Sequence, residues 1–396
     1  MGICLMRCSL LDYGLYFYPE EDNLALNKAC CTFASGHLGR NNTHSLERIS
    51  LSNLSDIFQD NHRIEAIKSL EKDEHFTSCN SCWKHEKVGY PSMRTRVNSV
   101  GMSGEIGQLK YLELNTGNTC NIQCVMCNPS DSLKTKMYIP IREKYDQKNL
   151  GKKWDSLYAR GLRRTDIDEL DFEIFKNLEY LKSTGGETFY SKEYWYMLEK
   201  FISKGYAKNI TIINVTNNTI PLDDNKLDIF KQFKKVKIFS SVDGIGDLCE
   251  SVRAGSKWKD VQENIKHLIE LSNQYPDIFV HTEPHSVVQF ANALQLDEIV
   301  NWWESVAMDD YKDKQYFRIL DDPKYYDIKN LDQSIKDSII KKYEKYDKLN
   351  HVVKYLETTT CEIDQNIGLS IFEESCKINN TKADSSEIYR IIKHGI

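Results

Sequence analysis

The sequence predicts an α/β fold whose main part is a partial, three-quarter (β/α)6 barrel, and three observations support this prediction. From Leu109 onward, short apolar runs alternate with helical segments, the pattern of parallel strands joined by right-handed crossovers. Six such units are present, fewer than the eight that close a barrel. Residues 1–100 are rich in turns and cysteines, and residues 326–396 are rich in Lys, Asp and Ile. We therefore expect a small Cys-rich unit (1–100), a TIM-like barrel (105–325) and a helical C-terminal extension (326–396).

The barrel strands are expected where short apolar runs are bounded by turn or helix signals. The six expected strands are Leu109–Leu114, Glu179–Ser183, Asn209–Asn214, Val236–Val242, Ile278–Glu283 and Gln315–Leu320. Helices are expected from the N-cap Ser191 to a point before Gly205, at about Trp258–Leu271 and at Asn292–Ala307. In such a fold the functional residues lie at the C-terminal ends of the strands.

Composition restricts the class of protein. Of the 396 residues, 40% are hydrophobic and 28% are charged, which suits a chain with a substantial core. No stretch has the roughly 18 to 20 apolar residues that span a bilayer, and Met1–Tyr18 lacks the features of a signal peptide. The net charge of −6 and the lack of a basic stripe disfavour nucleic acid as a partner. The expected location is the cytoplasm, without membrane association.

Nine of the twelve cysteines lie in the first third of the chain, and in a reducing compartment such clustering favours metal ligation over disulfides. Cys120, Cys124 and Cys127 directly follow the first expected strand. Three thiolates this close can hold one 4Fe–4S cubane, whose fourth iron stays open because the next cysteine is Cys249. Structural zinc needs four ligands, and no nearby His or Cys supplies the fourth. Three packed or zinc-binding cysteines are the alternative.

The C-x3-C-x2-C spacing of these residues resembles the signature of the radical S-adenosylmethionine (radical SAM) superfamily. The position before the third Cys, usually aromatic in that family, is Met126 here, and the resemblance implies that its backbone contacts the adenine of SAM. It also implies that SAM chelates the open iron through its amino and carboxylate groups. An electron donor such as flavodoxin or ferredoxin would supply the electron for its cleavage.

A second motif of the same family follows the second expected strand. Gly185, Gly186 and Glu187 are similar to the family's GGE element, in which the glutamate receives the amino group of SAM. Glycines at this point let the backbone approach the ligand closely. The alternative is an ordinary turn, because a glycine pair before Glu is common in turns.

Three further elements come in the family's order. Val215–Asn218 ends the third expected strand and resembles a T-N-G segment, with Asn217 as the candidate residue. Ser241 and Asp243 end the fourth, where related enzymes contact the ribose. The resemblance places Arg253 at the SAM carboxylate, a contact that a guanidinium makes well.

A second set of cysteines lies upstream, with Cys79 and Cys82 in one segment and Cys8, Cys30 and Cys31 further back. The segment from Cys79 continues as C-x2-C-x3-E-x2-G-x2-S-x-R, using Glu86, Gly89, Ser92 and Arg94. This looks like the twitch-domain radical SAM proteins, which carry a shortened relative of the SPASM extension. The resemblance implies an auxiliary 4Fe–4S cluster held by Cys8, Cys30 (or Cys31), Cys79 and Cys82.

Zinc remains an alternative at this second set, because C-x2-C pairs also serve four-cysteine zinc sites, and His85 could replace one cysteine there. Because adjacent residues of an extended segment point in opposite directions, only one of Cys30 and Cys31 should be a ligand, and we expect Cys30. Glu86 and Arg94 could instead pair with each other.

The function implied by the resemblance is reductive cleavage of SAM at the 4Fe–4S cluster to a 5′-deoxyadenosyl radical. This radical abstracts hydrogen from a peptide or small-molecule substrate. The residues His281, Glu283, His285 and Gln289, at or just after the end of the fifth expected strand, either face that substrate or belong to the core. The rival from another class is a non-catalytic binding protein stabilised by zinc or by a cluster.

Overall fold

The computed structural model describes residues 7–17, 24–26, 28–31, 33, 48–129, 131–145 and 161–395. The chain divides into two compact units. The first unit comprises Met1–Gly117, Ala159–Asn214 and Asp224–Val236, and the second comprises Asn118–Tyr158, Val215–Asp223 and Lys237–Ile396. These units cut across the segments 1–100, 105–325 and 326–396 expected from the sequence, which remain a sequence-based division.

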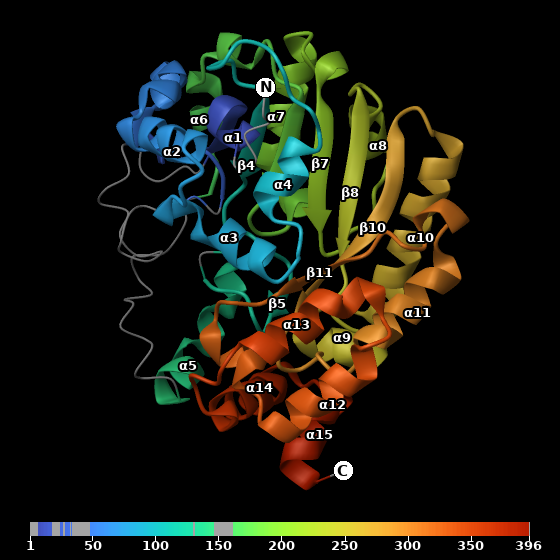
Figure 1. Ribbon diagram of the computed structural model, residues 1–396. Helices are drawn as coiled ribbons and strands as arrows, with labels where there is room; N and C mark the ends of the chain where they lie inside the picture. The colour runs from blue at the N-terminus through green and yellow to red at the C-terminus, as the bar shows by residue number, and fades with distance from the viewer. Residues whose placement is uncertain are drawn as a thin grey trace. The chain divides into compact units, whose positions relative to one another are not determined.

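In the described ranges the protein has a mixed α/β structure with seven strands in its main sheet (Figure 1). Four of them, in the order β1-β4-β6-β7, belong mainly to the first unit, and three, in the order β8-β10-β11, to the second. Their bounds are β1 Gly14–Phe17, β4 Tyr111–Asn115, β6 Tyr180–Thr184, β7 Thr211–Thr216, β8 Lys235–Ser241, β10 Phe279–Val288 and β11 Tyr316–Ile319. The pairs β1–β4, β4–β6, β6–β7 and β10–β11 are parallel. The short antiparallel pairs are β2 (Leu24–Leu26) with β3 (Arg48–Ser50) and β5 (Gln123–Cys124) with β9 (Arg253–Ala254).

All six strands expected from the apolar runs are present, and the bounds of five of them differ from the expected ones by one or two residues at each end. The exception is β10, which runs on to Val288, so His281, Glu283 and His285 lie inside the strand rather than at its end. The sequence analysis missed β1, whose burial on both faces leaves no alternation to recognise. Gly14 starts this strand where a Cβ atom would lie 2.8 Å from the carbonyl oxygen of Leu10.

The helices of the first unit begin with α1, which is short and follows Cys8. Their bounds are α1 Ser9–Tyr13, α2 Asn61–Glu71, α3 Asn80–Lys87, α4 Met93–Asn98, α6 Arg164–Glu169, α7 Lys192–Ser203 and α8 Asp224–Phe230. The predicted cap at Ser191 is confirmed, since its side chain accepts a hydrogen bond from the backbone of Tyr194 at 3.2 Å. A cap of this kind stabilises a helix by about 1 kcal/mol.

The helices of the second unit include four in the C-terminal segment that was expected to be helical. Their bounds are α5 Ile139–Tyr145, α9 Gly246–Val252, α10 Trp258–Gln274, α11 Leu296–Val306, α12 Gln333–Tyr343, α13 Asn350–Thr358, α14 Gln365–Asn379 and α15 Glu387–His394. Figure 1 shows α12 to α15 as one orange-to-red group. The helix expected at Asn292 begins only at Leu296, because the Asn292 side chain accepts from the backbone of Gln289 at 2.9 Å and so forms a turn.

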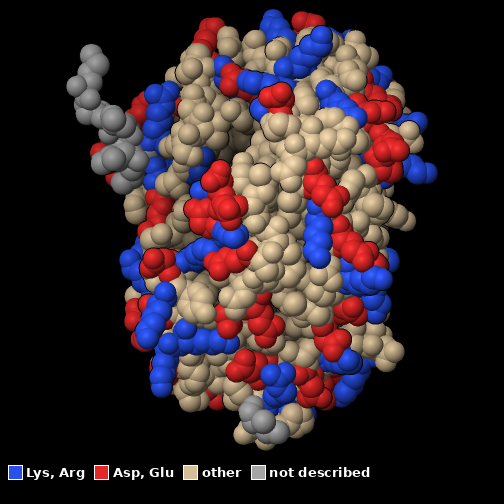
Figure 2. Space-filling model, turned by 90° about the vertical axis from the view of Figure 1, so that its right-hand side faces the viewer, with Lys and Arg blue, Asp and Glu red and all other residues tan. Residues whose placement is uncertain are grey.

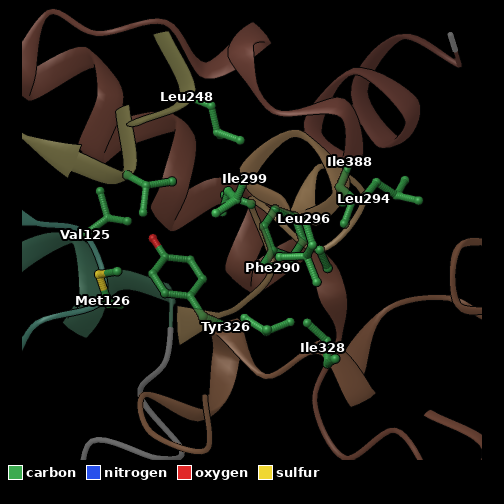
Figure 3. Packing of buried hydrophobic residues seen from close by; sticks show 14 of the residues in the cluster. Val125, Met126, Leu248, Phe290, Leu294, Leu296, Ile299, Tyr326, Ile328 and Ile388 are labelled. Carbon is green, nitrogen blue, oxygen red and sulfur yellow. The ribbon is translucent and has the colours of Figure 1, made fainter. Parts of the chain in front are cut away.

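The core of the second unit joins residues that lie far apart in sequence. Val125 and Met126 of the cysteine loop, Phe290 and Ile299 of the middle of the chain, and Ile388 of α15 belong to one buried cluster (Figure 3). Burial of this much apolar surface is the main source of stability for such a unit. The loop that carries the cysteines is therefore part of the core and not a surface appendage.

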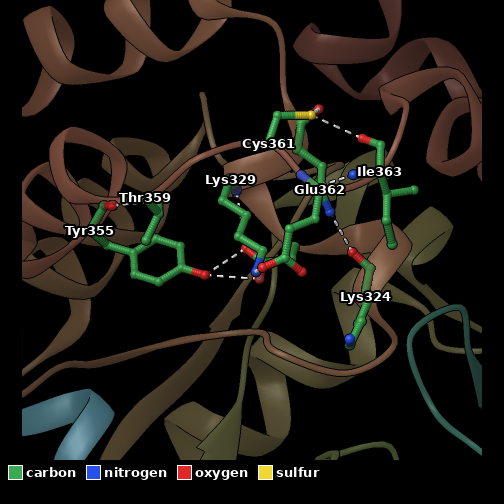
Figure 4. A network of polar contacts seen from close by, with 9 residues as sticks. Lys324, Lys329, Tyr355, Thr359, Cys361, Glu362 and Ile363 are labelled. Carbon is green, nitrogen blue, oxygen red and sulfur yellow. Dashed lines mark hydrogen bonds and ion pairs between the residues drawn. The ribbon is translucent and has the colours of Figure 1, made fainter.

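A polar network links the start of the C-terminal segment to the chain after α13 (Figure 4). The hydroxyl of Tyr355 donates to the carboxylate of Asp327 at 2.8 Å, and Lys329 pairs with Glu362 at 2.8 Å. The side-chain oxygen of Asn330 accepts from the backbone of Glu362 and Ile363 at 2.9 and 3.1 Å. These contacts satisfy buried groups of an irregular segment, as burial requires.

The hydropathy of the helices and the distribution of surface charge bear on the class of protein. Within the described ranges, no helix is long and apolar enough to cross a membrane. On the face in Figure 2, basic and acidic side chains are interspersed.

Candidate functional site

The three cysteines of the C-x3-C-x2-C motif lie in one loop of the second unit, around the short strand β5. Cys124 is buried with 4% exposure, and Cys120 and Cys127 are half-buried. The backbone amide of Cys127 donates to the carbonyl of Cys124 at 3.1 Å, which turns the chain back on itself. Cys124 thus lies in the core, whereas Cys120 and Cys127 are partly exposed.

Arg253 lies opposite the buried cysteine, because β5 pairs with β9 in the register Cys124 to Arg253. Its guanidinium donates to the carboxylate of Asp243 at 2.7 Å. The second carboxylate oxygen of Asp243 accepts from the backbone of Val287 at 2.6 Å, and Asp243 is completely buried. Asp243 therefore fixes the orientation of Arg253 beside the cysteine loop.

The charges of this group shift one another's pKa values. A hydrogen bond from the Cys127 thiol lowers the pKa of Cys124 against the effect of burial, and the positive charge of Arg253 lowers it further. The same hydrogen bond, together with burial, raises the pKa of Cys127. Burial opposes the charge of Arg253, but the negative charges of Cys124 and Asp243 outweigh it and raise the Arg253 pKa. Thiolate is the form that ligates metals, and a lowered pKa makes this form easier to reach at Cys124.

Asn217 lies at the other end of the loop, just after β7. Its side-chain amide donates to Asn121 at 2.9 Å and approaches the sulfur of Cys120 at 3.9 Å. Its carbonyl oxygen accepts from the backbone of Thr219 at 2.9 Å. Asn218 next to it adopts a left-handed conformation with φ of 55°, which Asn tolerates better than most residues.

Two other predicted residues of the second unit have ordinary surroundings. Met126 is 7% exposed and packs in the core shown in Figure 3. Ser241 is the last residue of β8 and is half-buried.

The Gly185-Gly186-Glu187 turn belongs to the first unit. The amide of Gly186 donates to the carbonyl of Gly117 at 2.7 Å. A Cβ atom on Gly185, whose φ is 112°, would lie 2.5 Å from the same carbonyl oxygen, so only glycine fits this close approach of two loops. The carboxylate of Glu187 is buried and accepts from the backbone amide of Phe189 at 3.1 Å, which caps a short 3-10 helix.

The upstream cysteines come together in the first unit. Cys8, Cys30, Cys79 and Cys82 all line one pocket, together with apolar residues and Arg94. Cys31 is not among the residues that line it. Three segments of the chain, around Cys8, around Cys30 and from Cys79 to Cys82, therefore contribute one cluster of thiols.

This pocket is lined mostly by apolar side chains, and burial penalises thiolates in it. Burial raises the pKa of Cys8 to about 11 and, with the neighbouring cysteines, raises that of Cys79. Arg94 counteracts both shifts with its positive charge. Within the described residues, no three His, Cys, Asp or Glu side chains have the spacing of ligands around a single metal ion.

Two buried arginines support the pocket. Arg94 pairs with Glu86 and lies 4.6 Å from the centre of the Trp83 ring, so the alternative that Arg94 and Glu86 pair with each other holds in the structure. Arg63, which the sequence analysis did not single out, donates to the carbonyls of Leu11 and Gly14 at 3.2 and 2.9 Å. Burial lowers the pKa of Arg63 to about 10, against the charges of Asp60, Cys30 and Cys8.

Comparison with known proteins gives structural neighbours only. No family model and no curated protein matches the chain. It is similar to native anSMEcpe with bound AdoMet, at 17% identity and a TM-score of 0.38, covering 65% of each chain. It is also similar to native anSMEcpe with bound AdoMet and Cp18Cys peptide, at 17% identity, a TM-score of 0.37, and coverage of 65% of this chain and 64% of that one. The chain thus spans 65% of the length of the first of these structures, and its function is argued below from its own residues.

Proposed function

We propose that this chain is a radical SAM enzyme, an enzyme that cleaves S-adenosylmethionine reductively at a 4Fe–4S cluster held by Cys120, Cys124 and Cys127. The observation that carries the proposal is the arrangement of the cysteine loop. Its three cysteines lie in one loop, and Arg253 faces Cys124 across the β5–β9 pair. When bound, the cluster and SAM would supply a 5′-deoxyadenosyl radical for hydrogen abstraction.

The chemistry of the donor set fits such a cluster. Three thiols, one of them with a lowered pKa, are suitable ligands, and Arg253 adds positive charge where thiolates gather. Asp243 orients Arg253, so that Arg253 is the candidate for binding the SAM carboxylate. Glu187, for the SAM amino group, Ser241 and Asp243, for the ribose, and the backbone of Met126, for the adenine, keep the roles that the family resemblance implies.

We further propose that Cys8, Cys30, Cys79 and Cys82 hold an auxiliary 4Fe–4S cluster, in the manner of the twitch and SPASM units. The common pocket of these four thiols supports this proposal. Cysteine sulfurs are soft donors that suit iron–sulfur clusters and zinc. Burial raises the pKa of Cys8 and Cys79, so metal binding would have to release their protons. Zinc is the alternative occupant, and the metal content decides between them.

The remaining parts of the proposal follow from the family resemblance. The parallel strands would form the partial barrel of radical SAM proteins, and a donor such as flavodoxin or ferredoxin would deliver the electron. The substrate would be a peptide or a small molecule that reaches the C-terminal ends of the strands. A cytoplasmic location would keep the cysteines reduced.

The experiment that tests this proposal is preparation of the protein without oxygen, followed by iron, sulfide and zinc analysis. We expect a brown protein that forms 5′-deoxyadenosine from SAM when dithionite is added, even without substrate. A colourless protein that contains only zinc and does not bind SAM would support the rival binding protein instead.

A further inference from the structure

Arg142, on α5, is a completely buried arginine that contacts the backbone of the cysteine loop. One of its terminal nitrogens, Nη2, donates to the carbonyl of Val125 at 3.0 Å and to the carbonyl of Cys127 at 2.8 Å. These carbonyls flank Met126, so a single guanidinium nitrogen bridges the last turn of the loop. No motif in the sequence marks this residue.

The burial of this charge needs compensation. A buried guanidinium is costly unless it is hydrogen-bonded and close to negative charge. The two carbonyls supply hydrogen bonds, and Cys127 is itself one of the three cysteines. Ligating cysteines are thiolates, so the loop carries negative charge whenever it holds a cluster. Arg142 is thus placed to complement the charge of the occupied loop.

The helix that carries Arg142 is fixed from a second direction by the C-terminal segment. The hydroxyl of Tyr138, just before α5, donates to the carbonyl of Gln123 at 2.8 Å. Asn379, at the end of α14, donates to the same hydroxyl at 2.6 Å and accepts from the side chain of Gln123 at 2.7 Å. The guanidinium of Arg142 lies 5.6 Å from the centre of the Tyr138 ring. Arg142 therefore has a defined position relative to the loop.

We propose that Arg142 is a positioning residue that holds the cysteine loop in its ligating conformation and raises the reduction potential of the cluster. This inference rests on the proposed function. One electron from an external low-potential donor adds one negative charge to the cluster and nothing else changes place. A fixed buried cation favours the more negative, reduced state, and net charge and hydrogen bonding are known determinants of such potentials.

The test compares the neutral variants Arg142→Met and Arg142→Gln with the charge-conserving Arg142→Lys. Lys144→Met is the matched control, because Lys144 lies on the same helix with its side chain 60% exposed and paired with Glu374. Each protein is loaded with iron and sulfide without oxygen, and the cluster is titrated with dithionite in the presence of redox mediators. At the wild-type midpoint we expect at least a tenfold lower ratio of reduced to oxidised cluster in the neutral variants, which equals about 59 mV for one electron.

Arg142→Lys and Lys144→Met should keep the wild-type midpoint. If the neutral variants lose iron, their midpoint potential cannot be compared. The effect of the Arg142 charge is then measured by iron content, which should fall in the neutral variants and stay at the wild-type level in Arg142→Lys and Lys144→Met. An unchanged midpoint in a neutral variant with full iron, or an equal shift in Arg142→Lys, overturns the inference. Hydrogen exchange of residues 120–128 in the metal-free protein is a separate readout, and it should be faster in Arg142→Met than in Lys144→Met. Equal rates would show that Arg142 does not hold the loop.

A failure of the proposed function would give a different experimental result from a failure of the inference about Arg142. A wild-type protein that takes up no iron at Cys120, Cys124 and Cys127 would refute the cluster itself, while the hydrogen-exchange comparison would still report on the hold of Arg142 on the loop.

Discussion

The two cysteine sets of this chain are built in opposite ways. Cys120, Cys124 and Cys127 come from one loop, and their neighbours Asn217, Arg253 and Arg142 approach that loop from other elements. Cys8, Cys30 and the pair Cys79 and Cys82 come from three separate segments and meet in a largely apolar pocket.

This difference has an energetic consequence. A loop with three nearby thiols needs little chain ordering before it can bind, whereas thiols from three distant segments meet only when the loops between these segments close. Metal binding at the distributed set, as proposed, would therefore contribute more to folding than metal binding at the loop. The loop, in contrast, has two half-buried thiols, those of Cys120 and Cys127, and the adjacent Arg253. This arrangement suits a reactive site better than a site that only stabilises the fold.

The largest effect that separates the two sets is expected from replacing Cys120, Cys124 and Cys127 together by Ala. Formation of 5′-deoxyadenosine should disappear, because no thiolate is left to hold the cluster. About four irons per chain should remain, as one cubane at the upstream set requires. Iron analysis and chromatography of the SAM products measure both, with Cys361→Ala, an exposed cysteine, as the control. Undiminished SAM cleavage would break the assignment of the loop, and zinc in place of the remaining iron would indicate a structural site.

Replacement of Cys79 and Cys82 by Ala should act on stability first. We expect a lower melting temperature and the loss of about four irons per chain, since removal of ligands from a distributed site also removes a constraint on folding. Calorimetry under exclusion of oxygen, with Cys361→Ala again as the control, measures this effect. A melting temperature equal to that of the wild type would mean that the apolar pocket alone holds the segments together.

Glu187→Ala should weaken the binding of SAM without changing the metal content of either cysteine set. Loss of a charge-assisted hydrogen bond costs about 1.5 to 3 kcal/mol, so SAM should bind roughly ten- to a hundred-fold more weakly. The iron content should stay that of the wild type, because Glu187 is not a ligand of either set. Equilibrium dialysis with SAM gives the affinity. Equal affinities would reduce the role of Glu187 to capping the short helix at Phe189.

The smallest effect is expected from Cys31→Ala, and the adjacent Cys30→Ala is its matched partner. The amide of Cys31 donates to the carboxylate of Glu113 at 3.3 Å, and Glu113 pairs with Lys182 at 2.7 Å, while Cys30 lines the pocket. We expect iron content to fall in Cys30→Ala and to remain unchanged in Cys31→Ala. The reverse pattern would exchange the two residues in the proposed ligand set.

The sequence by itself determined six strands of the main sheet, the cysteine loop and the order of the motifs. Apolar runs specify strands because burial of a sheet needs them, and the three cysteines of the loop are recognisable because all ligands lie within one short segment. The spacing also identified Cys79 and Cys82 as a pair, and a glycine requirement was readable at Gly185. These features are local, so each of them can be recognised from a short run of consecutive residues.

Only the tertiary structure decided which distant residues meet. It brought Cys8 and Cys30 to Cys79 and Cys82, paired Arg253 with Asp243, and added β1 to the sheet beside β4. It also placed Arg142 and Arg63 against backbone carbonyls in the interior. A buried arginine has no sequence pattern of its own, because its burial is stabilised by carbonyls and charges that other segments supply.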